Sequence, residues 1–261
     1  MAVDSKRPRL RSAAMRVAAW VLLTIQLAAC SALQPMEIRK IALLAPFEGQ
    51  YRELGYNALY AVRLAMSEAE LDNVQLLPVD DGGDLNSARS RMRALNLDSA
   101  VVAIIALGEA ATHPSTQRAN DKAMILIGNW GQDRADEDSL QASDQARAEA
   151  GAQDDLLIAR QMISGDGRPQ DIFTSNGALP DAQFSARFVG GDQQFPRPNW
   201  LATLTYDLAR LALVAIAAGS DLSDIALDGL NGKIRFADGY WQEAPIHRYQ
   251  FQGGHLAPLS A

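Results

Sequence analysis

Short apolar runs alternate with amphipathic stretches through the first half of the chain. Four runs have strand length and are apolar almost throughout: residues 41–45, 74–79, 100–106 and 123–127. Such runs are typical of parallel strands that are covered on both faces. Between them, residues 54–69 repeat apolar side chains at helical spacing, and a second helix is expected to begin near Asn86, its predicted cap, and to run to about residue 95. The alternation predicts a doubly wound parallel sheet for residues 38–130.

The second half of the chain has a different pattern. Residues 131–155 hold eight acidic and two basic residues, which indicates a solvated helix or a disordered linker, and a short helix is expected over residues 155–163. Residues 201–218 carry leucine and alanine at steps of three and four, so they predict a core helix that Gly219 ends. The dipeptides Asp238-Gly239 and Gly253-Gly254 predict antiparallel hairpins in the last segment.

The N-terminus has the three-part layout of an export signal. Five basic residues precede or flank the start of an apolar run over residues 17–27, which is shorter than the roughly 20 residues that a membrane-spanning helix needs. The run ends in Leu27-Ala28-Ala29-Cys30, which resembles the lipobox of bacterial lipoproteins. The resemblance implies that residues 1–29 are removed, that Cys30 carries a diacylglycerol, and that residues 30–37 form a tether. The alternative is an ordinary secretory signal in which Cys30 is incidental.

Composition narrows the range of functions. Cys30 is the only cysteine, so an intrachain disulfide and a metal–thiolate cluster are excluded. The formal net charge is −7, and removal of residues 1–29 takes away five cations and one anion, a net +4, which leaves −11. A chain this acidic is not expected to bind nucleic acid.

Several segments together resemble the type 1 periplasmic binding proteins, the solute receptors of ABC importers. The segments are KIALLAPFEGQY at residues 40–51, VDDGGD at 79–84, LTYDLARLA at 204–212 and GKIRFADG at 232–239. The family has two α/β lobes, and this chain is short for two lobes of ordinary size. The resemblance therefore implies an α/β fold, with one doubly wound lobe, a reduced or missing second lobe and C-terminal β-hairpins. Residues 131–170 would then be an acidic linker or a remnant of the second lobe, and residues 171–261 would complete the first lobe.

The same resemblance implies a ligand site at the ends of the parallel strands. Loops at the carboxyl ends of such strands converge, and backbone N–H groups at a helix start favour a carboxylate. The candidate ligand-binding residues on this basis are Phe47, Tyr51, Gly108, Glu109, Thr112, Asn129, Trp130 and Tyr206. The alternative for the loops is ordinary connecting structure. Trp130 either stacks on a ligand or packs at the rim of the cleft, and Tyr206 either reaches the ligand or packs in the core.

No catalytic constellation is present in the sequence, so the chain is expected not to be an enzyme and no cofactor is expected. His113, His247 and His255 stand alone, without nucleophile-elbow, zinc-helix or phosphate-loop motifs. His247 and His255 either face each other across the last hairpin or are surface residues, and no metal site is expected. The acidic turn at residues 80–84 lacks the ligand spacing of a calcium loop, which favours a plain turn and helix cap.

The expected function is that of a membrane-anchored lipoprotein that binds an amino acid or a small polar ligand for an ABC importer. The alternative is a non-transporting lipoprotein that uses the same fold to regulate a cell-envelope enzyme. The expected partners are the membrane lipid and either an ABC permease or a cell-envelope protein. The expected location is the outer face of the cell membrane or the periplasmic side of an envelope membrane.

Overall fold

The computed structural model describes residues 37–135, 138–165, 167–168, 171–189 and 196–259. The chain divides into two units, Met1–Glu37 and Ile38–Ala261. The predicted signal peptide, Cys30 and the tether up to residue 36 lie outside the described residues. The second unit contains all the helices and strands discussed below.

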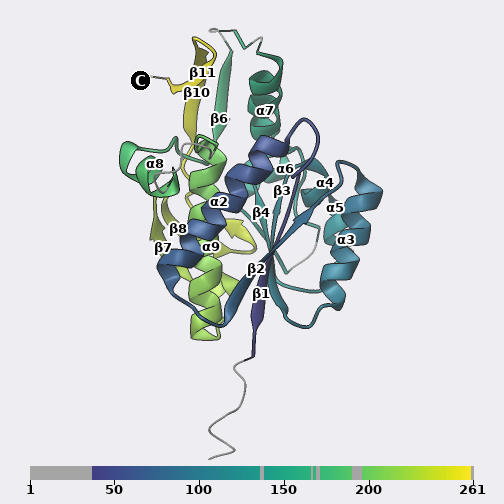
Figure 1. Ribbon diagram of the computed structural model, residues 1–261. Helices are drawn as coiled ribbons and strands as arrows, with labels where there is room; N and C mark the ends of the chain where they lie inside the picture. The colour runs from purple at the N-terminus through teal and green to yellow at the C-terminus, as the bar shows by residue number, and fades with distance from the viewer. Residues whose placement is uncertain (1–36, 136–137, 166, 169–170, 190–195, 260–261) are drawn as a thin grey trace, which may run out of the picture. The chain divides into compact units, whose positions relative to one another are not determined.

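The second unit is built on an eight-stranded sheet with the order β2–β1–β3–β4–β5–β9–β8–β7 (Figure 1). Its strands are β1 (Arg39–Ala45), β2 (Val74–Asp80), β3 (Val101–Leu107), β4 (Met124–Ile127), β5 (Ser139–Gln141), β7 (Ala226–Gly229), β8 (Gly232–Ala237) and β9 (Tyr240–Trp241). Strands β1 to β5 are parallel, β9 is parallel to β5, and β8 is antiparallel to both of its neighbours. The order of the first five strands is that of a doubly wound fold, which reverses direction between β1 and β3.

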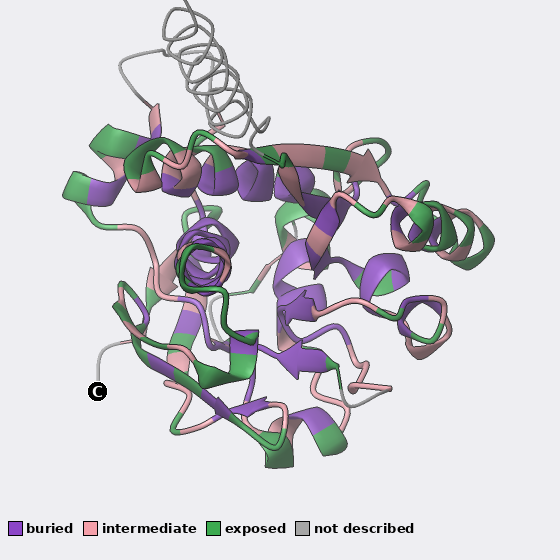
Figure 2. Ribbon diagram, turned by 90° about the horizontal axis from the view of Figure 1, so that it is seen from below, coloured by how far each residue is buried: buried purple, intermediate pink, exposed green. Residues whose placement is uncertain are grey.

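Alternate residues of each parallel strand enter two different cores. In β1, Ile41 and Leu43 face the core beneath α2 (Arg52–Ala69) and α9 (Trp200–Ala218). Ala42 and Leu44 face the opposite core beneath α3 (Leu85–Leu97). Two short helices complete that second face: α4 (Glu109–Thr112) and α5 (Pro114–Gln117). Figure 2 shows buried residues along the strands and on the inner sides of the helices, with exposed residues on their outer sides. Because both faces are covered, the strands are apolar almost throughout, as the sequence predicts.

Helix α9 is the central helix of the larger core. Asn199 caps its first turn by accepting hydrogen bonds from the N–H groups of Leu201 and Ala202, and Gly219 ends it in the left-handed conformation at φ 64°. Among the described residues, α9 alone has the length and hydropathy of a membrane span, yet 72% of that window is buried inside the protein. The sequence-based prediction of a core helix is therefore confirmed.

A second, three-stranded sheet has the order β11–β10–β6 and lies beyond one end of the main sheet (Figure 1). It consists of β6 (Ile172–Ser175), β10 (His247–Gln252) and β11 (His255–Pro258), and α7 (Asp154–Ser164) packs against β6. The remaining elements are α6 (Gln145–Glu149), α8 (Ala182–Val189) and the short 3-10 helix η1 (Leu222–Asp224). The predicted fold class is confirmed: the chain is a mainly parallel α/β protein with C-terminal hairpins. The small sheet, against which α7 packs, is the part of this fold that fits a reduced second lobe.

The interpretation of residues 131–155 as a solvated helix or a disordered linker is wrong at residues 139–141. Strand β5 extends the main sheet there, and α6 follows it. The apolar pattern missed β5 because both residues beside Leu140 in this strand are polar although they are buried. Ser139 and Gln141 are each 1% exposed. The Gln141 side chain donates to the carbonyl oxygen of Gly128, which replaces an apolar contact with a hydrogen bond. The short helix expected over residues 155–163 is present as α7.

Candidate functional site

A cavity of about 550 Å³ lies where the loops after β1, β2, β3 and β4 meet, and we refer to it as the switch-point cavity. Its walls come from residues 46–51, 81–85 and 108–113, together with Trp130, Gln132 and Leu156. It adjoins the point at which the strand order reverses, which is the usual ligand position in doubly wound sheets. Its volume is also within the range of small-molecule sites.

Asp80 joins the first two of these loops. Its Oδ1 accepts hydrogen bonds from the backbone N–H groups of Phe47 (2.8 Å) and Glu48 (3.1 Å), and its Oδ2 accepts from Gly82 and Arg91. The acidic turn is therefore a structural turn that fixes the loop after β1, which agrees with the favoured sequence interpretation.

The cap of α3 is Asp84, and the prediction of Asn86 in that role is wrong. The Asp84 carboxylate accepts from the N–H groups of Asn86 and Ser87 and from the Ser87 hydroxyl, and these bonds lower its pKa. Helix α3 begins two residues earlier than the sequence suggests because Asp84 has the extended backbone of a cap residue.

Two glycines permit the close packing of the loops. A Cβ on Gly55 would lie 2.1 Å from the carbonyl oxygen of Pro46, so only glycine lets α2 approach the loop after β1. Gly108 has φ +100°, and a Cβ there would lie 3.2 Å from Pro46 and 3.6 Å from Oδ2 of Asp81. At Gly108, which borders the cavity, the wall is thus formed by backbone.

Trp130 forms part of the cavity wall as a packed side chain. It is 2% exposed, and its indole N–H donates to the carbonyl oxygen of Ile127 at 2.6 Å. Of the two alternatives for this residue, the geometry favours packing, with the indole ring bordering the cavity.

A buried carboxylate, Asp155, holds the loop after β4 against the small sheet. Its Oδ2 accepts from the Asn129 N–H, and its Oδ1 accepts from the Ser175 hydroxyl and the Trp200 indole N–H, each at 2.6 Å. Asp155 is fully buried, and desolvation raises its pKa above the ordinary value despite these hydrogen bonds. The four residues, which we call the Asp155 network, join the loop after β4, α7, β6 and α9.

The cavity brings together four of the eight predicted ligand-binding residues: Tyr51, Gly108, Glu109 and Trp130. Three others lie near it but are used elsewhere. Phe47 packs edge-on against Tyr56, the Thr112 hydroxyl donates to the carbonyl of Gly108, and the Asn129 amide donates to Asn176.

Tyr206 lies away from the switch-point cavity, on α9, and lines a separate hollow of about 410 Å³. Its hydroxyl donates to Glu68, and the guanidinium groups of Arg187 and Arg210 lie 5.4 and 5.6 Å from its ring centre. Burial is the main cause of its raised pKa. The alternative of a packing role is the one that the geometry supports.

Sequence reasoning missed six polar lining residues: Glu48, Gln50, Asp81, Asp84, His113 and Gln132. The sequence contained a signal for Asp81, because the acidic turn follows directly after a predicted strand, at the same sheet edge as the other loops. His113 was considered only as a catalytic or metal residue. Its Nδ1 instead caps α5 by accepting from the Ser115 N–H.

His247 and His255 do not face each other across the last hairpin. The strand register pairs His255 with Gln252, and it pairs His247 with Ser175 on β6. Within the described parts of the chain, no group of three or more potential metal-ligating side chains is found.

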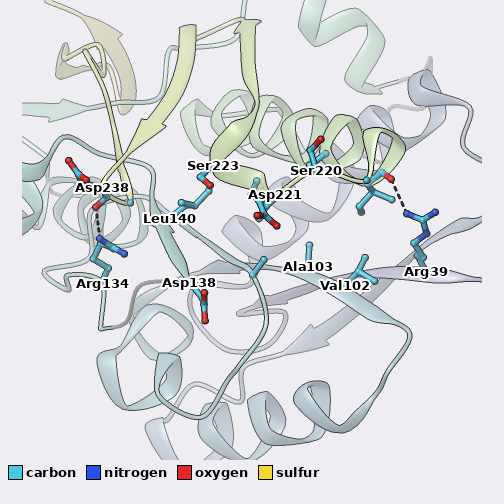
Figure 3. Close-up of a pocket in the computed structure, with 16 residues that line it drawn as sticks. Arg39, Val102, Ala103, Arg134, Asp138, Leu140, Ser220, Asp221, Ser223 and Asp238 are labelled. Atoms are coloured by element: carbon cyan, nitrogen blue, oxygen red, sulfur yellow. Dashed lines mark hydrogen bonds between the residues drawn. The ribbon is translucent and has the colours of Figure 1, made fainter.

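A larger cavity, about 760 Å³, lies at the opposite, amino-terminal ends of the parallel strands (Figure 3). It is bordered by the amino ends of β3 and β4 and by the C-terminal end of α9. Its two arginines are engaged with backbone carbonyls: Arg39 donates to Ile216 at 2.9 Å, and Arg134 donates to Ser139 and Asp238. Because ligands of doubly wound sheets bind at the carboxyl ends of the strands, we take the switch-point cavity as the candidate site.

Solved structures with the same fold are solute-binding proteins of ABC transporters. One, from R. palustris, was solved with benzoate; it is 12% identical, with a TM-score of 0.61 over 85% of this chain and 95% of that one. A branched-chain amino-acid substrate-binding protein from Streptococcus pneumoniae, solved with isoleucine, is 14% identical, with a TM-score of 0.62 over 84% and 98%. A leucine-binding protein from Thermotoga maritima is 13% identical, with a TM-score of 0.62 over 85% and 98%.

The chain therefore has the fold of the type 1 periplasmic binding proteins, as the sequence resemblance implies. No protein-family model matches the sequence, and no curated protein matches it. These structural neighbours are binding proteins rather than enzymes, which agrees with a non-enzymatic function at the level of the fold.

Proposed function

We propose that this protein is an exported lipoprotein, anchored through Cys30, that binds a small polar solute in the switch-point cavity. The observation that carries the proposal is the cavity itself, which four loops form at the carboxyl ends of the parallel strands. Backbone and side-chain polar groups line it together with Tyr51, Trp130 and Leu156. This mixture is typical of sites for small polar ligands.

The reduced second lobe favours a solute that is exchanged readily. In a two-lobed receptor the ligand is enclosed between lobes, which removes it from water. Here α7 contributes only Leu156 to the cavity wall, and the small sheet contributes none of the described lining residues. We infer that the protein captures an amino acid or a similar small molecule and presents it to an ABC permease. Purified chain that binds no small solute in equilibrium dialysis would contradict this part of the proposal.

Lipid anchoring is the most readily tested part. The lipobox-like segment places a nucleophilic thiol directly after small residues, and as the only cysteine in the sequence Cys30 has no partner for an intrachain disulfide. Replacement of Cys30 by alanine is expected to move the protein from the membrane fraction to the soluble exported fraction and to abolish labelling by a radioactive fatty acid. Unchanged membrane association of the Cys30→Ala protein would rule out this anchor.

A second candidate function is a non-transporting interaction module. It is favoured by apolar side chains that α7 and the small sheet leave exposed: Leu157, Ile163, Ile172 and Ile246 are between 43% and 53% exposed. Clustered exposed apolar residues often mark contact surfaces. In cells, a photo-crosslinker at position 163 distinguishes the two candidates. Crosslinks to a cell-envelope enzyme favour the interaction module, and crosslinks to a permease favour transport.

A further inference from the structure

The switch-point cavity is lined by carboxylates without a matching cation. Glu48, Asp81, Asp84 and Glu109 border it, and none of the described lining residues is lysine or arginine. Arg91, which lies in α3 beside the acidic turn, pairs with Asp80 at 3.1 Å. A ligand whose recognised group is an anion would therefore meet unfavourable charge on several sides.

The four carboxylates differ in their hydrogen bonds to the protein and in their exposure to solvent. Asp84 uses both of its oxygens to cap α3. Glu48 and Glu109 are exposed at the rim, where solvent screens them. Asp81 alone is buried, at 2% exposure.

Asp81 presents a free acceptor to the cavity. Its Oδ1 accepts from the Gly83 N–H at 2.8 Å, whereas no described residue donates a hydrogen bond to its Oδ2. Oδ2 lies next to Gly108, at the carboxyl end of β3, because a Cβ on Gly108 would be 3.6 Å from it. Because Asp81 borders the cavity, a ligand there can donate a hydrogen bond to this oxygen.

The electrostatic state of Asp81 agrees with this geometry. Burial raises the pKa of its carboxyl group, and the net shift is upward although the Gly83 hydrogen bond and the charge of Arg91 lower this pKa. The neighbouring carboxylates of Asp80 and Asp84 raise it further. A cation beside the carboxylate would offset the desolvation cost.

The remaining walls suit an alkyl chain next to a positive charge. Ala110 and Leu156 provide aliphatic surface, and the rings of Tyr51 and Trp130 provide aromatic surface. Aromatic rings attract cations that lie over their faces, and they also pack against alkyl groups.

We propose that the switch-point cavity recognises the ammonium group of a small aliphatic amine, which donates hydrogen bonds to Oδ2 of Asp81 while its alkyl chain lies against Trp130 and Leu156. The inference rests on the proposed function, since it names the ligand class of the same cavity. It differs from the solutes in the neighbouring structures, because benzoate and isoleucine both carry a carboxylate.

Isothermal titration calorimetry on the full-length protein, purified in mild detergent, tests the inference. The probes are cadaverine, which is a five-carbon diamine, glutarate, which is a dicarboxylate of the same length, and leucine. Cadaverine is expected to bind, and glutarate is expected not to bind. Asp81→Asn keeps the acceptor for Gly83 and removes the charge, so it is expected to weaken cadaverine binding at least about 30-fold.

Two further variants separate a local effect from a change of net charge or of folding. Asp72→Asn makes the same charge change at an exposed turn outside the cavity, and it is expected to leave binding unchanged. Glu109→Gln at the exposed rim is expected to weaken cadaverine binding about two- to fivefold. This variant provides the test of the cavity's charge if Asp81→Asn does not fold.

The outcomes distinguish the inference from the proposed function. Binding of glutarate or leucine without binding of cadaverine would overturn the inference and leave the proposed function standing. Equal affinity of cadaverine for the native and Asp81→Asn proteins would also overturn it. If none of the three probes binds, the inference fails, and thermal unfolding against a broader set of solutes then decides whether the proposed function fails with it.

Discussion

Asp155 is a carboxyl group without solvent exposure, yet each of its oxygens accepts short hydrogen bonds. Its partners come from positions that are 20, 26 and 45 residues away in the sequence. The sequence shows Asp155 only as one acid in an acidic stretch, because nothing local distinguishes a buried carboxylate from its partly exposed neighbour Asp154. Residue-scale roles of this kind depend on tertiary contacts that periodicity does not encode.

Replacement of Asp155 by alanine is expected to lower the free energy of unfolding by about 3 kcal/mol, because three buried donors lose their acceptor. The matched control is Asp154→Ala. Asp154 is partly exposed and pairs with Arg147 at 2.6 Å, so its loss is expected to cost less than about 1 kcal/mol. Urea unfolding measures both values, and equal costs for the two variants would contradict the structural role of the Asp155 network.

The pH dependence of stability gives a separate test of Asp155. Burial raises its folded-state pKa above the ordinary 3.8, so the folded chain holds this proton more tightly than the unfolded chain. The stabilisation is fully present below about pH 3.8 and is lost as the pH rises through the raised pKa. The stability of the native protein relative to Asp155→Asn should therefore fall as the pH rises from about 4. Urea unfolding over a pH series checks this, and a constant or rising difference would contradict the assigned direction.

At the scale of the elements, the pattern of apolar residues predicts the parallel strands and their covering helices. It misses a strand that consists mainly of polar residues. Strands β1 to β4 and helices α2 and α9 follow their predicted ranges closely, because burial on one or both faces imposes a strict pattern. Strand β5 is not predicted because it is only three residues long and two of these residues are polar. The hairpin turns are confirmed, whereas the joining of β9 to the main sheet and of β10 to β6 depends on long-range pairing.

Helix α2 offers a prediction in which two effects have opposite signs. Helix propensity favours alanine over glycine by about 1 kcal/mol, so Gly55→Ala would ordinarily stabilise an exposed helix. Here the new Cβ would lie 2.1 Å from the Pro46 carbonyl oxygen, so α2 must move. We expect a net loss of about 1–3 kcal/mol in the free energy of unfolding.

Ser67→Ala on the exposed side of the same helix is the control for propensity, and it is expected to raise stability slightly. Thermal and urea unfolding compare the two variants. A Gly55→Ala protein more stable than the native one would show that the close approach of α2 to Pro46 is not a constraint.

At the scale of the whole molecule, the candidate site follows from topology. The sequence identified the loops after β1, β3 and β4 because parallel strands place their carboxyl ends together, and four of the eight named residues border the cavity. The other four do not border the cavity. For those in loops the physical reason is that single backbone dihedrals and hydrogen bonds, such as those of Thr112 and Asn129, decide whether a side chain faces the cavity or the core. Asp81, which carries the most specific chemistry, was interpreted only as part of a turn.

The central claim is that the switch-point cavity binds a small solute, and thermal unfolding of the purified protein against a panel of solutes tests it most directly. The panel includes amines, amino acids, sugars and carboxylates, and the control is Ala110→Phe, which fills the cavity from α4. A solute present at 100 times its Kd should stabilise the native protein by about 2.7 kcal/mol and leave Ala110→Phe unaffected. An unfolding temperature that no solute in the panel raises would contradict the claim.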